Sequence, residues 1–191
     1  MSDAVTEVLS ARVEVVAPRL LGCELVRRLG GIELRGRIVE VEAYSQEDAA
    51  SHSYRGETNR TKVMFGPPGF LYVYFTYGMH YCCNIVTGQP GHGSAVLIRA
   101  LEPLAGQPEM SHRRHGLDGE SLTNGPAKLC QAFGIDKLLN GHDLREAPLR
   151  LEIRPPLKQT EIVQTTRIGI SQAKDVPWRF CIRDNSYVSK H

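Results

Sequence analysis

The chain has 191 residues, of which 41% are hydrophobic and 23% are charged, and its formal net charge is +2. These values are ordinary for a globular protein, so they exclude a disordered chain and predict a single domain over residues 1–191. No apolar run approaches the roughly 18 residues that a membrane-spanning helix needs, so we expect no membrane partner.

The N-terminal segment and the cysteines indicate where the protein works. The segment MSDAVTEVLS lacks the basic start and the small-residue cleavage site of a signal peptide. The cysteines are odd in number and show no C-x-x-C spacing, so neither a disulfide framework nor a zinc site is indicated. We therefore expect an intracellular protein in a reducing compartment.

The first part of the chain predicts a helix, a hairpin and a long loop. Paired glycines between two alternating apolar runs are a typical hairpin signal, and long loops inside compact domains are usually functional. The predicted elements are a helix within residues 3–21 that breaks near Pro18, strands over 20–29 and 32–44 joined at Gly30-Gly31, and a polar loop over 45–69.

The rest of the chain continues with short strands and few helices. The predicted elements are a hairpin over 70–86 that turns at 77–80, a strand over 95–104, a polar connection over 105–124, a helix over 125–133 capped by Asn124, and strands at 149–153, 167–170 and 180–183. Consecutive hairpins of this kind favour an α+β domain with a curved, mainly antiparallel, barrel-like β-sheet and peripheral helices. A doubly wound parallel sheet is less favoured.

The segment VEVEAY at residues 39–44 places two carboxylates in a predicted strand, although carboxylates are poor strand formers. Strand alternation puts Glu40, Glu42 and Tyr44 on one face. The apolar residues before this segment have the opposite parity, which predicts a bulge near residues 36–39. In the next hairpin, alternation likewise puts Tyr72 and Tyr74 on one face.

Each of these features has an ordinary explanation when it is considered alone. A Glu-x-Glu pair usually marks a solvated face, tyrosines in a hairpin usually pack, and a loop histidine such as His52 is usually structural. Aromatic side chains beside carboxylates, with basic residues around them, are nevertheless typical of a pocket that binds a nucleobase. The basic clusters are Arg27-Arg28, Arg35/Arg37, Arg60/Lys62 and Arg113-Arg114.

Longer motifs make the resemblance specific. The runs RGRIVEVEAY, AASHS, LYVYFTYGMHYCCNIV, VLIRALEPL and NGPAKLCQAFGI occur in this order, and the chain resembles the alkyladenine (3-methyladenine) DNA glycosylase family of the mammalian type. The resemblance runs from about Leu20 to the TTRIGI and PWRF segments. It implies one DNA glycosylase domain, a monomer without metal or cofactor, that acts on damaged double-stranded DNA in base excision repair. Such an enzyme flips alkylated or deaminated purines out of the duplex and hydrolyses the N-glycosidic bond without lyase activity.

The resemblance also implies a role for each matched residue. Glu42, the glutamate before Ala-Tyr, is the general base that activates a water molecule, and Arg99 helps to hold that water. For Glu40 we expect an ion pair with a nearby arginine rather than a part in catalysis. The remaining roles are enclosure of the extruded base by Tyr44, His52 and Tyr74, exclusion of guanine by Asn84, and insertion into the duplex by Tyr77.

Two other classes of protein share some of these features. A zinc nucleobase deaminase also flips bases, but it needs H-x-E followed by P-C-x-x-C, and neither motif occurs here. A non-catalytic module that binds RNA or single strands can use the same aromatic hairpin. Such a module would not need Glu42 to face the tyrosines, so this residue discriminates between the two interpretations.

Overall fold

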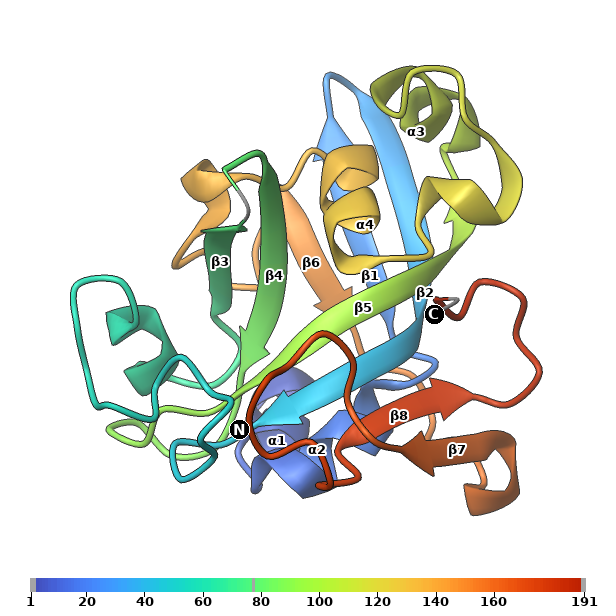
Figure 1. Cartoon of the computed structure of the whole chain (residues 1–191). Helices are drawn as coiled ribbons and strands as arrows, with labels where there is room; N and C mark the ends of the chain where they lie inside the picture. The colour runs from blue at the N-terminus through green and yellow to red at the C-terminus, as the bar shows by residue number, and fades with distance from the viewer. Residues whose placement is uncertain (1–2, 77, 190–191) are drawn as a thin grey trace.

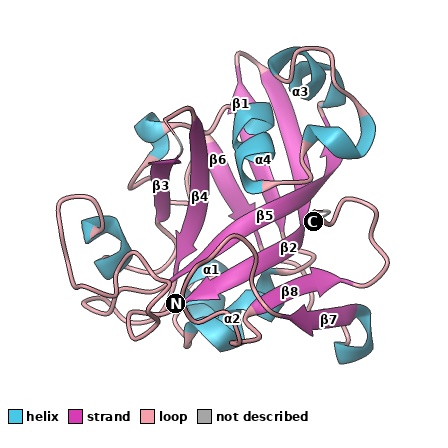
Figure 2. Ribbon diagram, in the orientation of Figure 1, coloured by secondary structure: helices cyan, strands magenta, loops and turns pink. Residues whose placement is uncertain are grey.

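The computed structural model describes residues 3–76 and 78–189, which form a curled antiparallel sheet with short helices around it (Figure 1; Figure 2). The helices are α1 (Ala4–Leu9), α2 (Val13–Leu20), α3 (Gln107–Arg113) and α4 (Pro126–Phe133), with 3-10 turns at Lys62–Phe65, Gly119–Leu122, Lys137–Leu139 and Gln159–Glu161. The strands are β1 (Glu24–Leu29), β2 (Ile32–Tyr44), β3 (Leu71–Thr76), β4 (His80–Val86), β5 (Ala95–Ala105), β6 (Leu149–Glu152), β7 (Ile162–Thr165) and β8 (Arg179–Ile182).

The long strand β2 organises the sheet, whose order is β3-β4-β5-β2-β1-β6. Along one side β2 pairs with β5, while on the other side its first half pairs with β1 and residues 40–42 pair with β8. The register of β2 against β5 shifts between Arg35 and Gly36 and again around Glu40. These irregularities confirm the predicted change of face in this strand, because a bulge moves following side chains to the other side.

Residues 140–144 join the two ends of the sheet. The Leu71 N–H of β3 donates to the His142 carbonyl at 2.8 Å, and the Leu144 carbonyl accepts from the Leu151 N–H of β6 at 2.8 Å. The sheet therefore curls into a half-barrel whose end strands, β3 and β6, are linked through this segment. The expected α+β fold with a curved, barrel-like antiparallel sheet is confirmed.

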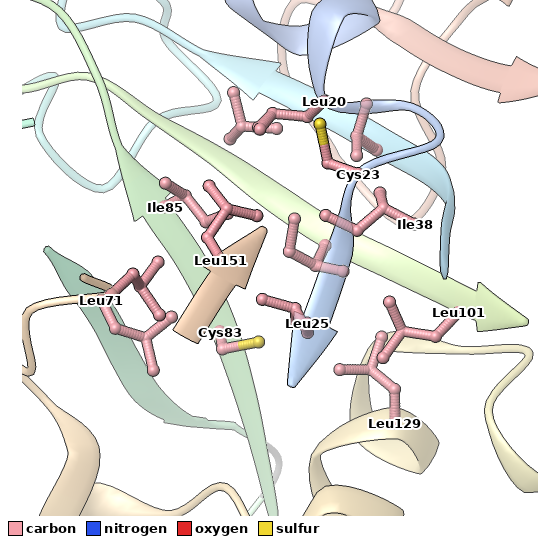
Figure 3. Packing of buried hydrophobic residues seen from close by; sticks show 14 of the residues in the cluster. Leu20, Cys23, Leu25, Ile38, Leu71, Cys83, Ile85, Leu101, Leu129 and Leu151 are labelled. Atoms are coloured by element: carbon pink, nitrogen blue, oxygen red, sulfur yellow. The ribbon is translucent and has the colours of Figure 1, made fainter. Parts of the chain in front are cut away.

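The hydrophobic core lies inside the curl, where α4 covers β4 and β5 (Figure 1). The ring of Phe133 in α4 comes so close to the backbone of β2 that a Cβ at Gly36 would lie 2.8 Å from it. Only glycine permits this approach. Figure 3 shows how the core draws on strands and helices distant in sequence, with Leu20, Cys23, Leu25, Ile38, Leu71, Cys83, Ile85, Leu101, Leu129 and Leu151 labelled.

Several boundaries differ from the sequence-based predictions. The N-terminal helix is broken at residues 10–12, where Ser10 closes α1 on the Thr6 carbonyl, and not at Pro18, which lies in the last turn of α2. The predicted strand at 167–170 is wrong, because β7 lies earlier, at Ile162–Thr165, where it can pair with β8. The connection over 105–124 contains α3 and a 3-10 turn. The N-cap of α4 is Gly125 and not Asn124, because the Asn124 side chain instead accepts a hydrogen bond from the Lys128 ammonium group.

Candidate active site

A row of paired residues crosses neighbouring strands and forms the floor of a cavity. In the backbone register, Tyr72 of β3 is opposite Asn84 of β4, Asn84 is opposite Leu97 of β5, and Leu97 is opposite Glu42 of β2. Side chains alternate along a strand, so the residues next to these, such as Ile85, face the core instead. The site and the core are therefore the two faces of the same strands.

The cavity has a volume of about 470 Å³, which lies in the range of small-molecule sites. The sheet supplies its floor, and two loops supply the walls, one over residues 49–52 and the other over residues 168–172. In Figure 1 the second loop, between β7 and β8, crosses in front of β2. The sheet residues that line the cavity include Glu42, Tyr44, Tyr72, Tyr74, Asn84 and Arg99.

Glu42 lies on the floor of the cavity and has no solvent exposure. Its Oε2 accepts a hydrogen bond from the Tyr44 hydroxyl at 2.8 Å, and its Oε1 accepts one from the Ile168 backbone N–H at 2.7 Å. Arg99 Nη1 is 3.4 Å from Oε2. These contacts fix the orientation of the carboxylate, and Oε1, which has one donor among the described residues, keeps an acceptor site for a further donor such as a water molecule.

Arg99 connects Glu42 to the second carboxylate of the VEVEAY segment. Its Nε donates to Glu40 Oε1 at 2.9 Å, and Arg179 Nε donates to the same oxygen at 2.7 Å. Burial alone would raise the pKa of Glu40, but Arg99, the Ser189 N–H and Arg179 outweigh it and lower the pKa. The expected pairing of Glu40 with a nearby arginine is confirmed.

The aromatic side of the cavity is built by tyrosines and one histidine. The rings of Tyr72 and Tyr74 stack with their centroids 5.7 Å apart, and the His52 ring meets Tyr74 edge-on at 4.6 Å. His52 Nδ1 lies 3.1 Å from the Tyr72 hydroxyl. Burial and the neighbouring Glu42 raise the pKa of the Tyr44 hydroxyl, so it stays a neutral donor to this carboxylate.

His52 gives a testable pH dependence. Burial and the nearby Arg60 lower its pKa from 6.5 to about 4, so the folded protein keeps the imidazole neutral. The unfolded chain takes up this proton near pH 6.5, so folding stability should fall as the pH drops from about 6.5 to about 4. Because solvent reaches the ring, we expect a modest effect.

Thermal unfolding at both ends of this pH range measures the effect. The melting temperature of His52→Gln should fall less on acidification than that of the native protein, while His112→Gln, on an exposed histidine, should follow the native protein. Equal falls for the native protein and His52→Gln would show that His52 titrates normally.

The structure brings together nearly all residues that the sequence singled out. Glu42, Arg99, Tyr44 and His52 line the same cavity, as do the other predicted base-binding residues, Tyr74 and Asn84. Their catalytic and binding roles remain predictions. Tyr77, predicted to insert into the duplex, lies outside the described residues.

Sequence reasoning missed the group that holds the two walls of the cavity together. Arg167 is buried and makes a double hydrogen bond with Asp48, with Nη2 3.1 Å from Oδ1, and its Nη1 also donates to the Ala43 carbonyl at 2.9 Å. Its guanidinium lies 4.7 Å from the centroid of the Tyr44 ring and 5.5 Å from that of Trp178. Asp48 and Arg167 belong to different loops and lie far apart in sequence, so no local pattern indicates their contact.

The basic clusters prove unequal as candidate DNA-binding surfaces. Arg27 is buried, and Arg35 and Arg37 form ion pairs with neighbouring glutamates. Arg60, in contrast, is exposed and lies over the Tyr74 ring at 5.8 Å from its centroid. Among the described residues, no group of His, Cys, Asp and Glu is arranged to hold a metal ion, and no helix is long and apolar enough to cross a membrane.

The curled sheet thus presents a buried, hydrogen-bonded carboxylate at the bottom of an aromatic cavity. The family model for methylpurine-DNA glycosylase matches residues 7–186, so the chain belongs to the methylpurine-DNA glycosylase family. The protein is therefore a DNA glycosylase, a hydrolase of base excision repair that binds DNA.

Curated relatives agree with this family over nearly the whole chain. A protein of Carboxydothermus hydrogenoformans named "Putative 3-methyladenine DNA glycosylase" is 54% identical to this chain over 179 residues, which cover 93% of this chain and 94% of the relative. The protein of that name in Methanoculleus marisnigri is 54% identical over 178 residues, covering 92% of each chain. The one in Rhodopseudomonas palustris is 51% identical over 179 residues, covering 93% of this chain and 84% of the relative.

Proposed function

We propose that this chain is a monofunctional DNA glycosylase that releases alkylated or deaminated purines, 3-methyladenine among them, from double-stranded DNA. The observation that carries the proposal is the position of Glu42, held by Tyr44 and Ile168 on the floor of an aromatic cavity. A module that only binds nucleic acid has no use for a buried carboxylate at this point. The names of the relatives support the substrate class.

The damaged nucleotide first leaves the duplex, because its base cannot be reached inside the stack. Extrusion costs a few kcal/mol, and this cost is smallest for a damaged or mispaired base. We propose that Tyr77, which lies between β3 and β4 in the sequence, fills the space in the stack and so offsets part of this cost, as wedges in the minor groove do. Arg60, which is exposed and lies over the Tyr74 ring, is placed at the cavity to meet the DNA backbone.

The cavity then selects the base. Alkylation at N3 or N7 makes a purine cationic, and stacking of that cation on Tyr44 and Tyr74 contributes roughly 0.5–2 kcal/mol. Asn84 is held in one orientation because its Nδ2 donates to the Tyr72 carbonyl at 3.2 Å. A side chain fixed in this way crowds the exocyclic amine of guanine and so disfavours undamaged guanine.

Hydrolysis proceeds through an oxocarbenium-like state at the sugar, as in other glycoside hydrolyses. Glu42 stabilises the positive charge on the sugar and takes a proton from the attacking water, while Arg99 holds that water. No lysine is among the described residues that line the cavity, so these residues offer no amine for a Schiff base. We therefore propose base release without cleavage of the DNA strand.

One chain supplies every group that this mechanism uses, so we propose that the protein acts as a monomer. The substrate is genomic DNA, so we also propose that it works inside the cell and without a membrane partner. No step requires a metal ion or an organic cofactor.

The proposed activity is tested by incubating the protein with duplexes that contain 3-methyladenine, hypoxanthine or ethenoadenine, followed by alkali to cleave abasic sites. We expect alkali-dependent cleavage at the lesion and none in the undamaged duplex, because only a damaged base both enters the cavity and leaves readily. Cleavage before alkali would contradict the absence of lyase activity. Binding of every lesion with no release of base would favour the non-catalytic nucleic-acid-binding alternative.

A further inference from the structure

The segment that follows β8 folds back onto β2 and β5, where it contacts Glu40 and Glu102. In this segment Asn185 Nδ2 donates to Glu102 Oε2 at 2.8 Å, beside Arg37. A turn follows, in which the Tyr187 N–H donates to Asn185 Oδ1 at 3.0 Å. Ser189, the last described residue, contacts Glu40 of β2.

Ser189 satisfies both oxygens of the buried Glu40 carboxylate. Its backbone N–H donates to Oε2 at 2.7 Å, and its hydroxyl donates to Oε1 at 2.9 Å. Among the described residues, the Ser189 N–H is the one donor to Oε2, whereas Oε1 also accepts from Arg99 and Arg179. Without Ser189, a carboxylate oxygen with no solvent exposure would lack a partner, and leaving such a group unsatisfied is costly.

Ser189 also completes the surroundings of the Arg99 guanidinium. Each nitrogen of that group has its own partner: Nε has Glu40 at 2.9 Å, Nη1 has Glu42 at 3.4 Å, and Nη2 has the Ser189 hydroxyl at 3.5 Å. The plane and direction of the guanidinium are therefore set jointly by the two carboxylates and the serine. A shift of Glu40 or of Ser189 turns Arg99 away from Glu42.

We propose that Ser189 is a positioning residue of the active site, which holds Arg99 against Glu42 through its contacts with Glu40 and Arg99. The proposal rests on the proposed function of Glu42 and Arg99. Ser189 is not among the residues that line the cavity, so it acts on the rate of bond cleavage and not on base binding. The segment over residues 185–189 is thus a functional part of the enzyme.

Full-length variants at this position test the proposal. Ser189→Ala removes the hydroxyl and keeps the N–H, so the single-turnover rate of base release should fall about tenfold. Ser189→Pro removes both donors and should lower this rate about 100-fold. Small displacements of catalytic groups have effects of this size. Ser189→Thr keeps both donors and should restore the rate. Ser186→Ala, on an exposed serine of the same segment, should match the native protein.

Lesion affinity separates positioning from a purely structural role. The dissociation constant for a lesion duplex and the melting temperature should stay close to native values in Ser189→Ala and Ser189→Thr. Native rates in both Ser189→Ala and Ser189→Pro would overturn the proposal, and so would parallel losses of rate, affinity and stability without rescue by Ser189→Thr. The native protein is measured in the same reaction: if it releases no base, the proposed function itself fails.

Discussion

Glu42→Gln should bind lesion DNA as tightly as the native protein and release almost no base. The amide keeps the size of the side chain and its contact with Tyr44, but it carries no charge to stabilise the sugar cation and cannot take a proton from water. Loss of a general base alone typically lowers a rate by 10²–10⁴-fold, and loss of charge stabilisation adds to it. We therefore expect single-turnover release to fall by at least about 10³-fold.

Two other glutamates serve as controls for the effect of Glu42→Gln on base release. Glu47→Gln is the control for a general effect of charge, because Glu47 is exposed and pairs with His92 outside the cavity floor. Glu40→Gln should have an intermediate effect, since Glu40 orients Arg99 without lining the cavity. A fully active Glu42→Gln beside an inactive Glu40→Gln would show that the general base has been assigned to the wrong carboxylate.

Arg167→Met should produce the largest loss of stability among single substitutions at the site. It leaves the Asp48 carboxylate buried without its counterion, and breaking one side of a buried ion pair typically costs about 3–5 kcal/mol. It also frees the Ala43 and Ala173 carbonyls that Arg167 holds. Denaturant unfolding measures the change in free energy, and base release should fall as well, because Ile168, the next residue, donates to Glu42.

Two further variants identify the cause of that loss. Arg12→Met breaks the ion pair between the exposed Arg12 and the partly exposed Glu14, and it should change the free energy of unfolding by less than about 1 kcal/mol. Adding Asp48→Asn to Arg167→Met removes the unpaired charge and should recover part of the stability. If the double variant is as unstable as the sum of the two single variants, the two side chains do not interact, contrary to their contacts.

The sequence predicts those parts of the fold and site that local patterns control. The hairpins follow from alternating apolar residues around Gly30-Gly31 and residues 77–80, and the grouping of Glu42 with Tyr44 follows from the same alternation. Resemblance to a family extends this to Arg99 and Asn84, on later strands. All of these residues lie on strands, where the period of two fixes the face of each side chain.

Other parts depend on contacts between distant segments that carry no periodic signal. Arg167 meets Asp48 only because the loop between β7 and β8 folds over β2, and the predicted strand at 167–170 was wrong for the same reason. Ser189 reaches Glu40 through an irregular turn. A buried ion pair or a backbone donor of this kind becomes visible only when the tertiary structure is known.

The row that runs from Tyr72 through Asn84 and Leu97 to Glu42 has a consequence for how such an enzyme can change during evolution. Because pocket and core share these strands, insertion or deletion of a single residue within one of them, unless a bulge such as those in β2 absorbs it, would exchange the faces of the following side chains and turn those of the cavity floor toward the hydrophobic interior. The floor therefore varies most readily by substitution at fixed length. We expect changes of length to be tolerated better in the loops over residues 45–61 and 166–178, which supply the walls of the cavity.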